Sequence, residues 1–130
     1  MPVVTVAKVV DASALGAVVF REPEADRVNA LLGDAILVAP VLLIYEMANV
    51  CLTKIRRHAH QRDAYLAQFA AFRLIPIEFA DIEYGEALSL AETSRLSFYD
   101  AVYLWLALGL NAELITLDKE LHAAWLACGG

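Results

Sequence analysis

The order of apolar runs along the chain is the feature that most restricts its fold. Four short runs have the β-branched or aliphatic composition of buried strands, and longer segments with helical spacing separate them. The runs that predict strands are Val3–Val10, Ala35–Ala39, Leu74–Ile77 and Glu113–Thr116. Strands that alternate with helices predict a parallel sheet with right-handed crossovers and with helices on both faces. We therefore expect an α/β fold.

Two helices are expected in each of the first three gaps between strands, and one after the last strand. Pro40 suits a first helical turn, Ser97 an N-cap, and Gly33 and Gly109 helix ends. The expected helices cover Ala12–Phe20, Glu22–Leu32, Pro40 to about Arg57, His60–Phe72, Asp81–Ser94, Ser97 to about Leu108, and Lys119–Ala127. A chain of 130 residues has the size of one domain.

The composition is unusually apolar for a chain of this size. Hydrophobic residues make up 60% of it and the mean hydropathy is +0.56, against about 45–50% in an average soluble domain. Because a small domain cannot bury so much apolar surface, we expect a homodimer, a partner protein, or both. A membrane span needs about 20 consecutive apolar residues, and Pro40 and Glu46 interrupt the best window, Ile36–Val50. With no signal-peptide pattern either, the expected location is the cytoplasm.

Four acidic residues flank or interrupt the most apolar segments: Asp11, Glu46, Asp100 and Asp118. Asp11 and Asp118 follow predicted strands, Asp100 lies near the start of the helix that leads into the last strand, and Glu46 lies inside an apolar helix. In a parallel α/β fold all four positions can reach the edge where the strands end, and ligands bind at that edge. An ionised carboxylate is costly to bury unless it is paired or binds a metal. The four acids therefore suggest a shared cation.

Each aspartate also has a simpler interpretation as part of a helix cap. Asp11 and Asp118 can accept from backbone N–H groups of the helices that follow them. Asp100 lies three residues after Ser97, as in a capping box. Glu46 has no such role. One acidic site accounts for all four residues better than coincident caps together with an unpaired interior Glu.

The residue types at this site favour a hard cation. A cluster of carboxylates raises its own pKa values unless a cation neutralises it, and carboxylates with an amide and hydroxyls nearby suit Mg²⁺ or Mn²⁺. The cysteines and histidines form no zinc-binding pattern. Such a site predicts phosphoryl chemistry, in which the cation polarises a phosphate and activates water. The sequence contains neither a serine–histidine–acid set nor a phosphate-binding glycine loop.

The net charge of -6 argues against nonspecific nucleic-acid binding, but the positive residues are concentrated. One basic stretch contains Lys54, Arg56, Arg57 and Arg62, with His58 and His60 between them. It is either a phosphate-binding surface for RNA or a solvated helix end whose cations favour the helix dipole.

Four segments together carry a family resemblance: Val9–Leu15, Tyr45–Val50, Ser97–Leu104 and Leu114–Leu121. In this order and at this spacing they resemble the PIN domain, and within it the VapC-type toxin ribonucleases, over nearly the whole chain. The Tyr-Asp-Ala stretch around Asp100 and the Thr-Leu-Asp stretch that ends at Asp118 are the specific ones. The resemblance implies a three-layer α/β/α sandwich around a central parallel sheet, and RNA cleavage with Mg²⁺ or Mn²⁺ held by the acids.

Roles follow from the resemblance residue by residue. The four acids match the acidic quartet of the family, with the three aspartates at the metal. Ser13 and Thr116 match hydroxyl positions near the metal, and Asn49 matches a polar residue that holds Glu46 in position. The resemblance also implies a homodimer, and a cognate antitoxin whose C-terminal segment lies in a groove near the acids.

These observations predict a single PIN domain over residues 1–130 that acts as a Mg²⁺- or Mn²⁺-dependent endoribonuclease, the toxin half of a toxin–antitoxin pair. One alternative is a PIN nuclease of RNA processing without an antitoxin. Another is an aspartyl-phosphate phosphatase with Asp11 as nucleophile. That chemistry usually needs a second acid two residues on as proton donor, and Ser13 stands there. A non-catalytic module would lack one of the four acids, and none is missing.

Overall fold

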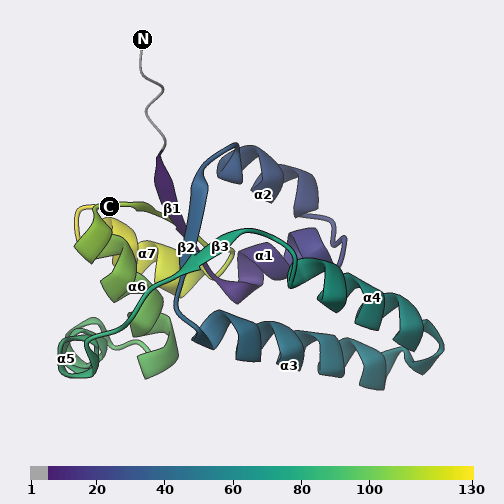
Figure 1. Cartoon of the computed structure of the whole chain (residues 1–130). Helices are drawn as coiled ribbons and strands as arrows, with labels where there is room; N and C mark the ends of the chain where they lie inside the picture. Colours follow the sequence, from purple (N-terminus) through teal and green to yellow (C-terminus); the bar gives the residue numbers. More distant parts are fainter. Residues whose placement is uncertain (1–5) are drawn as a thin grey trace, which may run out of the picture.

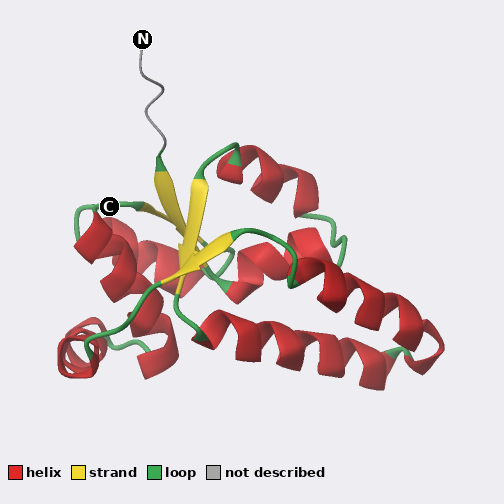
Figure 2. Ribbon diagram, in the orientation of Figure 1, coloured by secondary structure: helices red, strands yellow, loops and turns green. Residues whose placement is uncertain are grey.

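The computed structural model describes residues 6–130 and shows strands alternating with pairs of helices (Figure 1, Figure 2). The strands are β1 (Ala7–Val10), β2 (Ile36–Ala39), β3 (Ile77–Phe79) and β4 (Glu113–Ile115). The helices are α1 (Ala12–Val19), α2 (Ala25–Leu32), α3 (Leu42–Arg57), the 3₁₀ turn η1 (Ala59–Gln61), α4 (Arg62–Phe72), α5 (Tyr84–Ser94), α6 (Phe98–Leu110) and α7 (Lys119–Ala127). The predicted alternation is confirmed.

The four strands form one parallel sheet in the order β3-β2-β1-β4. Val9 in β1 pairs with Val38 of β2 on one side and with Leu114 of β4 on the other. Since all strands run the same way, their C-terminal ends meet at one edge. The central position of β1 beside β4 therefore places the residues that follow these two strands next to each other.

Two layers of helices cover the sheet and complete the α/β/α sandwich. Helices α1 to α4 pack on one face and α5 to α7 on the other. Figure 1 shows α3 and α4 running side by side beyond the sheet, so that the turn between them lies far from the strands. We call this projecting pair the α3–α4 arm.

Strict alternation along the strands explains why both faces need helices. In β1, Val9 faces the α5–α7 core and Val10 the α1–α4 core. Leu114 and Ile115 of β4 divide between the two cores in the same way. All four side chains are at most 3% exposed, so each face contributes burial at about 25 cal/mol per Å² of apolar surface.

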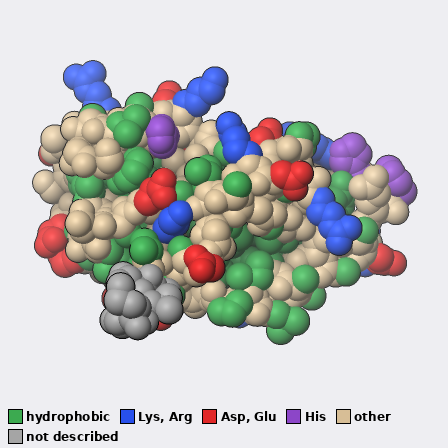
Figure 3. Space-filling model, turned by 90° about the horizontal axis from the view of Figure 1, so that it is seen from above, with side chains coloured by type: hydrophobic (Ala, Val, Ile, Leu, Met, Phe, Trp, Pro, Cys, Tyr) green, Lys and Arg blue, Asp and Glu red, His purple; other side chains and the backbone are tan. Residues whose placement is uncertain are grey.

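The surface is mixed in charge. Figure 3 shows Lys and Arg side chains interspersed with acidic ones, with hydrophobic side chains exposed between them. None of the helices within residues 6–130 combines the length and the apolar character needed to cross a membrane.

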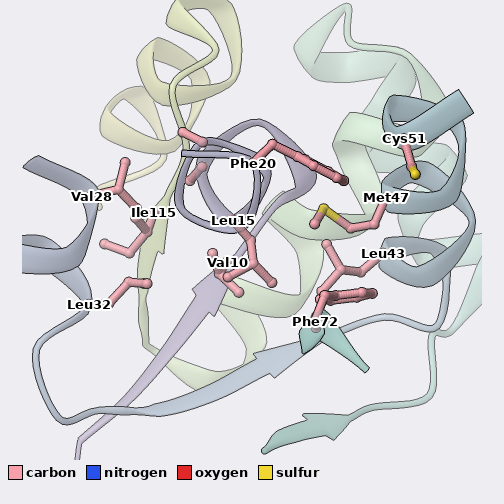
Figure 4. Packing of buried hydrophobic residues seen from close by; sticks show 13 residues of the cluster. Val10, Leu15, Phe20, Val28, Leu32, Leu43, Met47, Cys51, Phe72 and Ile115 are labelled. Carbon is pink, nitrogen blue, oxygen red and sulfur yellow. The ribbon is translucent and has the colours of Figure 1, made fainter. Parts of the chain in front are cut away.

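The larger of the two cores joins the sheet to the helix that bears Glu46. Figure 4 shows Val10 and Leu15 facing Leu43 and Met47 of α3 across this core. All four side chains are at most 1% exposed. Leu43 and Met47 bracket Glu46 on α3, so their packing fixes the position of that helix against α1. The start of α1 in turn follows Asp11.

Several element boundaries differ from the prediction, each for a local reason. The third strand is Ile77–Phe79 rather than Leu74–Ile77, because Pro76 has no N–H for the ladder and the strand begins after it. Helix α2 starts at Ala25 rather than Glu22, since Pro23 disfavours helical backbone at the residue before it.

The other differences lie at helix ends and at the start of the chain. Helix α5 starts at Tyr84 rather than Asp81, because the Glu83 side chain caps Gly85 and Glu86. Helix α6 runs through Gly109 to Leu110 and ends at Asn111, whose left-handed backbone (φ 50°) closes it. The predicted first strand, Val3–Val10, lies partly outside the described residues, and β1 covers Ala7–Val10.

Candidate active site

Asp11 is a buried carboxylate at the C-terminal end of the central strand. It is 5% exposed, and both its oxygens accept hydrogen bonds. Oδ1 accepts from Ser13 Oγ (2.7 Å) and from the backbone N–H of Ala14 (3.0 Å). Oδ2 accepts from Thr116 Oγ1 (2.5 Å). Asp11 is thus both the N-cap of α1 and the centre of a wider network.

That network joins the ends of β1 and β4. Ser13 Oγ lies 3.3 Å from Thr116 Oγ1 and accepts from the Leu117 N–H at 2.9 Å. Thr116 Oγ1 accepts from the Asp118 N–H at 3.0 Å. The two hydroxyls therefore fix the loop after β4 against the loop after β1, which brings Asp118 to the same edge as Asp11.

The remaining aspartates confirm part of the capping interpretation. Asp118 Oδ1 accepts from the Leu121 N–H (2.9 Å) and so caps α7. At α6 the capping oxygen belongs to Ser97, which accepts from the Asp100 N–H (3.1 Å). The Asp100 carboxylate itself is not the capping group, and Asp118 keeps its second oxygen free of hydrogen bonds within residues 6–130. Capping does not exclude a further role for either acid.

Glu46 has a partner that the sequence analysis missed. The hydroxyl of Tyr103, a residue 1% exposed in α6, donates to Glu46 Oε1 at 2.6 Å. Nothing in the apolar pattern around Tyr103 indicates that its hydroxyl has a polar partner. Its position three residues after Asp100, on the same face of α6, is the signal that would have found it. Asn49, predicted to hold Glu46, makes no hydrogen bond with it within the described residues.

The four acids interact electrostatically although they come from four separate segments. Burial raises the pKa of Asp11, against the hydrogen bonds from Thr116, Ser13 and Ala14, and the charge of Asp118 raises it further. Burial likewise raises the pKa of Glu46, and the charges of Asp11 and Asp100 add to it. Burial, then Asp118 and Asp11, raise the pKa of Asp100. The site therefore holds negative charge that its own residues do not neutralise.

The donor chemistry of the site fits a hard divalent cation. Carboxylate and hydroxyl oxygens are the ligands that Mg²⁺ and Mn²⁺ prefer, and a cation would relieve the repulsion that raises these pKa values. Within residues 6–130, however, no three Asp, Glu, His or Cys side chains are already placed to hold one ion together. Side chains would have to turn toward the ion as it binds.

Asn49 and Ser13 share a surface groove with Glu46. This groove has a volume of about 490 Å³, and its walls include Tyr45 and Tyr99. The position two residues after Asp11, where an aspartyl-phosphate phosphatase would carry its second acid, holds a hydroxyl that donates to Asp11 instead. Hydroxyl groups thus donate to the carboxylates of Asp11 and Glu46.

The predicted RNA-binding cations lie on the α3–α4 arm rather than at the acids. Arg57 is eleven residues after Glu46 on α3, which is about 16 Å along the helix. Lys54 pairs with Glu22 at 2.7 Å, and Arg62 lies 3.4 Å from exposed Asp63. Arg56 and Arg57 are exposed in the last turn of α3.

Comparison with known proteins identifies the family. The profile of the PIN domain matches residues 8–124, nearly the whole chain. The chain belongs to the PIN domain family. It is similar to the protein in "Crystal Structure of PAE2754 from Pyrobaculum aerophilum", with 27% identity and a TM-score of 0.75, over 92% of this chain and 84% of that one. No curated protein matches it.

Membership gives the coarse function. PIN domains are generally nucleases, and they typically use divalent metals. A nucleic-acid substrate follows for this chain. The acidic edge described above is the part of this PIN domain whose chemistry suits that reaction.

The raised pKa of Asp11 predicts how stability changes with pH in the metal-free protein. Because burial raises the pKa of Asp11 in the folded protein above its ordinary value of 3.8, the stabilising contribution of Asp11 is complete below that value and is lost as pH rises through the folded pKa. Asp11→Asn removes this loss. In EDTA, the unfolding free energy of wild type relative to Asp11→Asn should fall as the pH rises above the ordinary aspartate pKa, until the folded carboxyl has ionised.

Urea unfolding at several pH values measures this difference. The hydrogen bonds lost in Asp11→Asn change its free energy of unfolding by a similar amount at every pH. The informative quantity is therefore how the difference between wild type and variant changes with pH. Asp34→Asn, at an exposed site just before β2, controls for the loss of one negative charge. A wild-type-minus-variant difference that stays constant or rises with pH would contradict the prediction.

The Tyr103–Glu46 hydrogen bond gives a second prediction. Tyr103→Phe keeps the ring but removes the donor from a carboxylate, which should lower the free energy of unfolding by about 1.5–3 kcal/mol. Tyr84→Phe is the matched control, because Tyr84 is 70% exposed. In a double-mutant cycle, Glu46→Gln should lose most of its own effect in the Tyr103→Phe background. Equal effects of Tyr103→Phe and Tyr84→Phe would show that the bond contributes nothing.

Proposed function

We propose that this PIN domain is a Mg²⁺- or Mn²⁺-dependent endoribonuclease and the toxin component of a toxin–antitoxin pair. The observation that carries the proposal is the convergence of the four acids at the C-terminal edge of the sheet. Hydrogen bonds through Thr116 join Asp11 to the backbone of Asp118, and the charge of Asp11 acts on both Glu46 and Asp100. We take residues 1–130 as one functional domain.

Three aspartates would hold the cation. Asp11 and Asp118 are brought together by the Ser13–Thr116 network, and the carboxylate of Asp100 lies within their electrostatic reach. A bound divalent cation supplies polarisation of the scissile phosphate and activation of a water molecule. Asp11 needs its hydroxyl partners for this, because they fix the direction in which its remaining lone pairs point.

Glu46 would complete the cluster and orient the attacking water. Tyr103 holds one oxygen of Glu46 and leaves the other for such a contact. The bond from the buried Tyr103 keeps the half-buried carboxylate in one orientation, which is what positioning of a nucleophile requires. Ser13 and Thr116 act on Asp11 in the same way, and Asn49 lines the groove through which a substrate would reach Glu46.

Exposed aromatic residues near the acids support protein partners. Tyr45 and Tyr84 are each 70% exposed and Tyr99 is 60% exposed. They line a groove of about 330 Å³ that includes Val41. Such an apolar groove suits the homodimer contact and the antitoxin segment that the composition and the resemblance imply. We place the toxin and its antitoxin in the cytoplasm.

A nuclease of RNA processing without an antitoxin is the alternative, and the genome separates the two. A small neighbouring reading frame whose product relieves growth inhibition supports the toxin assignment. The absence of growth inhibition on expression of this chain alone favours RNA processing.

Asp11→Asn tests the reaction directly. It should lower kcat/KM for Mg²⁺-dependent RNA cleavage by at least about 100-fold, or about 2.7 kcal/mol of transition-state stabilisation, with the fold intact by circular dichroism. Asp34→Asn is the same change at an exposed site before the start of β2, away from the edge where the strands end. This variant should cleave like wild type. Cleavage by Asp11→Asn at the wild-type rate would remove the catalytic assignment.

The arm cations carry a separate prediction. Arg56 and Arg57 are exposed and too far along α3 for a role in the chemistry, so the double replacement by Gln should raise KM more than it lowers kcat. Steady-state cleavage of a labelled RNA at fixed salt measures both constants. A fall in kcat with unchanged KM would place these residues at the reacting atoms instead.

A further inference from the structure

A third groove, between α2 and α7, opens beside the acidic site. Its volume is about 380 Å³. Thr116, Leu117 and Asp118 are part of its wall, and all three belong to the hydrogen-bond network around Asp11. The α2–α7 groove therefore adjoins the acidic site, with which it shares Thr116 and Asp118.

Three basic side chains from two helices line this groove. Arg27 comes from α2, and Lys119 and His122 come from α7. Lys119 and His122 are three residues apart and share a helix face. All three are exposed.

The charges of Arg27 and Lys119 form no ion pair within the described residues. The ion pairs within residues 6–130 are Lys8–Glu113, Lys54–Glu22 and Arg62–Asp63. None includes Arg27, Lys119 or His122, whereas Lys54 of the predicted basic stretch is already paired. Unpaired positive charge thus lies next to the acidic site.

We propose that the α2–α7 groove binds the phosphodiester backbone of the RNA strand next to the scissile bond. The inference rests on the proposed ribonuclease function and adds a subsite to it. Arg27 and Lys119 contact backbone phosphates, and His122 adds a hydrogen-bond donor.

The electrostatics of the site explain why such a subsite is needed. Four carboxylates repel a polyanion, and a nuclease must hold phosphates next to them. On α3, the exposed cations Arg56 and Arg57 lie about 15 to 16 Å along the helix from Glu46, and Lys54, at about 12 Å, is already paired with Glu22. Lys119 follows Asp118 directly in the chain, so its charge lies beside one of the four acids.

The geometry of the groove also favours a nucleic-acid backbone. Arg27 presents a planar guanidinium, which binds phosphate oxygens through two parallel hydrogen bonds. Leu31 and Leu126, exposed by 42% and 52%, provide apolar walls for the sugars and bases between phosphates. Cations at the acidic end and apolar side chains in the same groove match the alternation of charge and apolar surface along a single strand.

The test uses the single variants Arg27→Gln and Lys119→Gln, with Arg73→Gln as control. Arg73 is an exposed arginine at the end of α4 and lies outside the groove. Each variant is made in the active protein for cleavage kinetics and in the Asp11→Asn background for binding. The binding probe is a fluorescently labelled single-stranded RNA of random sequence, followed by anisotropy over a range of salt concentrations.

Each groove variant should raise the KM and the Kd for RNA by roughly 3- to 10-fold. It should leave kcat within about twofold and reduce the slope of log Kd against log salt by about 0.7, the value for one phosphate contact with a single strand. Arg73→Gln should match its parent in all of these. Circular dichroism verifies the fold, and because the two residues lie on different helices, either variant alone is sufficient.

Two failures remain distinguishable. If the parent binds and cleaves RNA but both groove variants behave like Arg73→Gln, the subsite is wrong and the ribonuclease function stands. If the active protein does not cleave RNA and the Asp11→Asn protein does not bind it, the proposed function and the subsite are both wrong. A loss of kcat with unchanged Kd would also overturn the subsite, because it would place these side chains at the reacting atoms.

Discussion

The buried carboxylate of Asp11 holds the functional edge of this PIN domain together. It accepts hydrogen bonds from the hydroxyls of Ser13 and Thr116 and from the backbone N–H of Ala14. These bonds connect the first turn of α1 to the loop after β4, a hundred residues away in the chain. They add to the backbone bond from the Asp11 N–H to the Ile115 carbonyl and fix the side chains that hold the loop bearing Asp118 beside Asp11.

The same carboxylate explains why the site calls for a cation. Its burial raises its pKa in spite of three hydrogen bonds, and neighbouring acids raise the pKa values of Glu46 and Asp100 in turn. A carboxylate that served only as a helix cap would be more stable in contact with solvent. Burial of the ionised Asp11 carboxylate destabilises the fold, and perturbed carboxylates of this kind are concentrated at functional sites. In our proposal, the cations of the α2–α7 groove offset the repulsion from these acids where a polyanion would approach.

Much of the fold was predictable from the sequence because local patterns determine it. The alternation of apolar runs predicted the parallel α/β/α sandwich, and the β-branched residues of Val9 and Val10 predicted a strand buried on both faces. Boundaries were less predictable where a side chain or proline decides them. Glu83 caps α5 with both oxygens, and Pro76 delays β3, and neither effect follows from hydrophobic spacing.

The sequence predicted the four acids of the candidate site and the hydroxyls of Ser13 and Thr116, but not Tyr103, the hydrogen-bond partner of Glu46. Motif spacing indicated Asp11, Glu46, Asp100 and Asp118, because each is out of place on a core argument. Tyr103 was missed because an aromatic residue on an apolar helix is an ordinary core residue, and only its contact with Glu46 across two helices reveals another role. The α2–α7 groove was missed for a different reason: Arg27 and Lys119 are far apart in the chain and form no charged run.

The central claim is that these carboxylates share one divalent ion site. Crystals soaked in Mn²⁺ and measured by anomalous diffraction locate the ion without reference to activity. The account predicts manganese bonded to oxygens of Asp11, Asp100 and Asp118, with those side chains turned toward it. Fully soaked crystals with no manganese among the four acids, or with it bound only elsewhere on the surface, would contradict the claim.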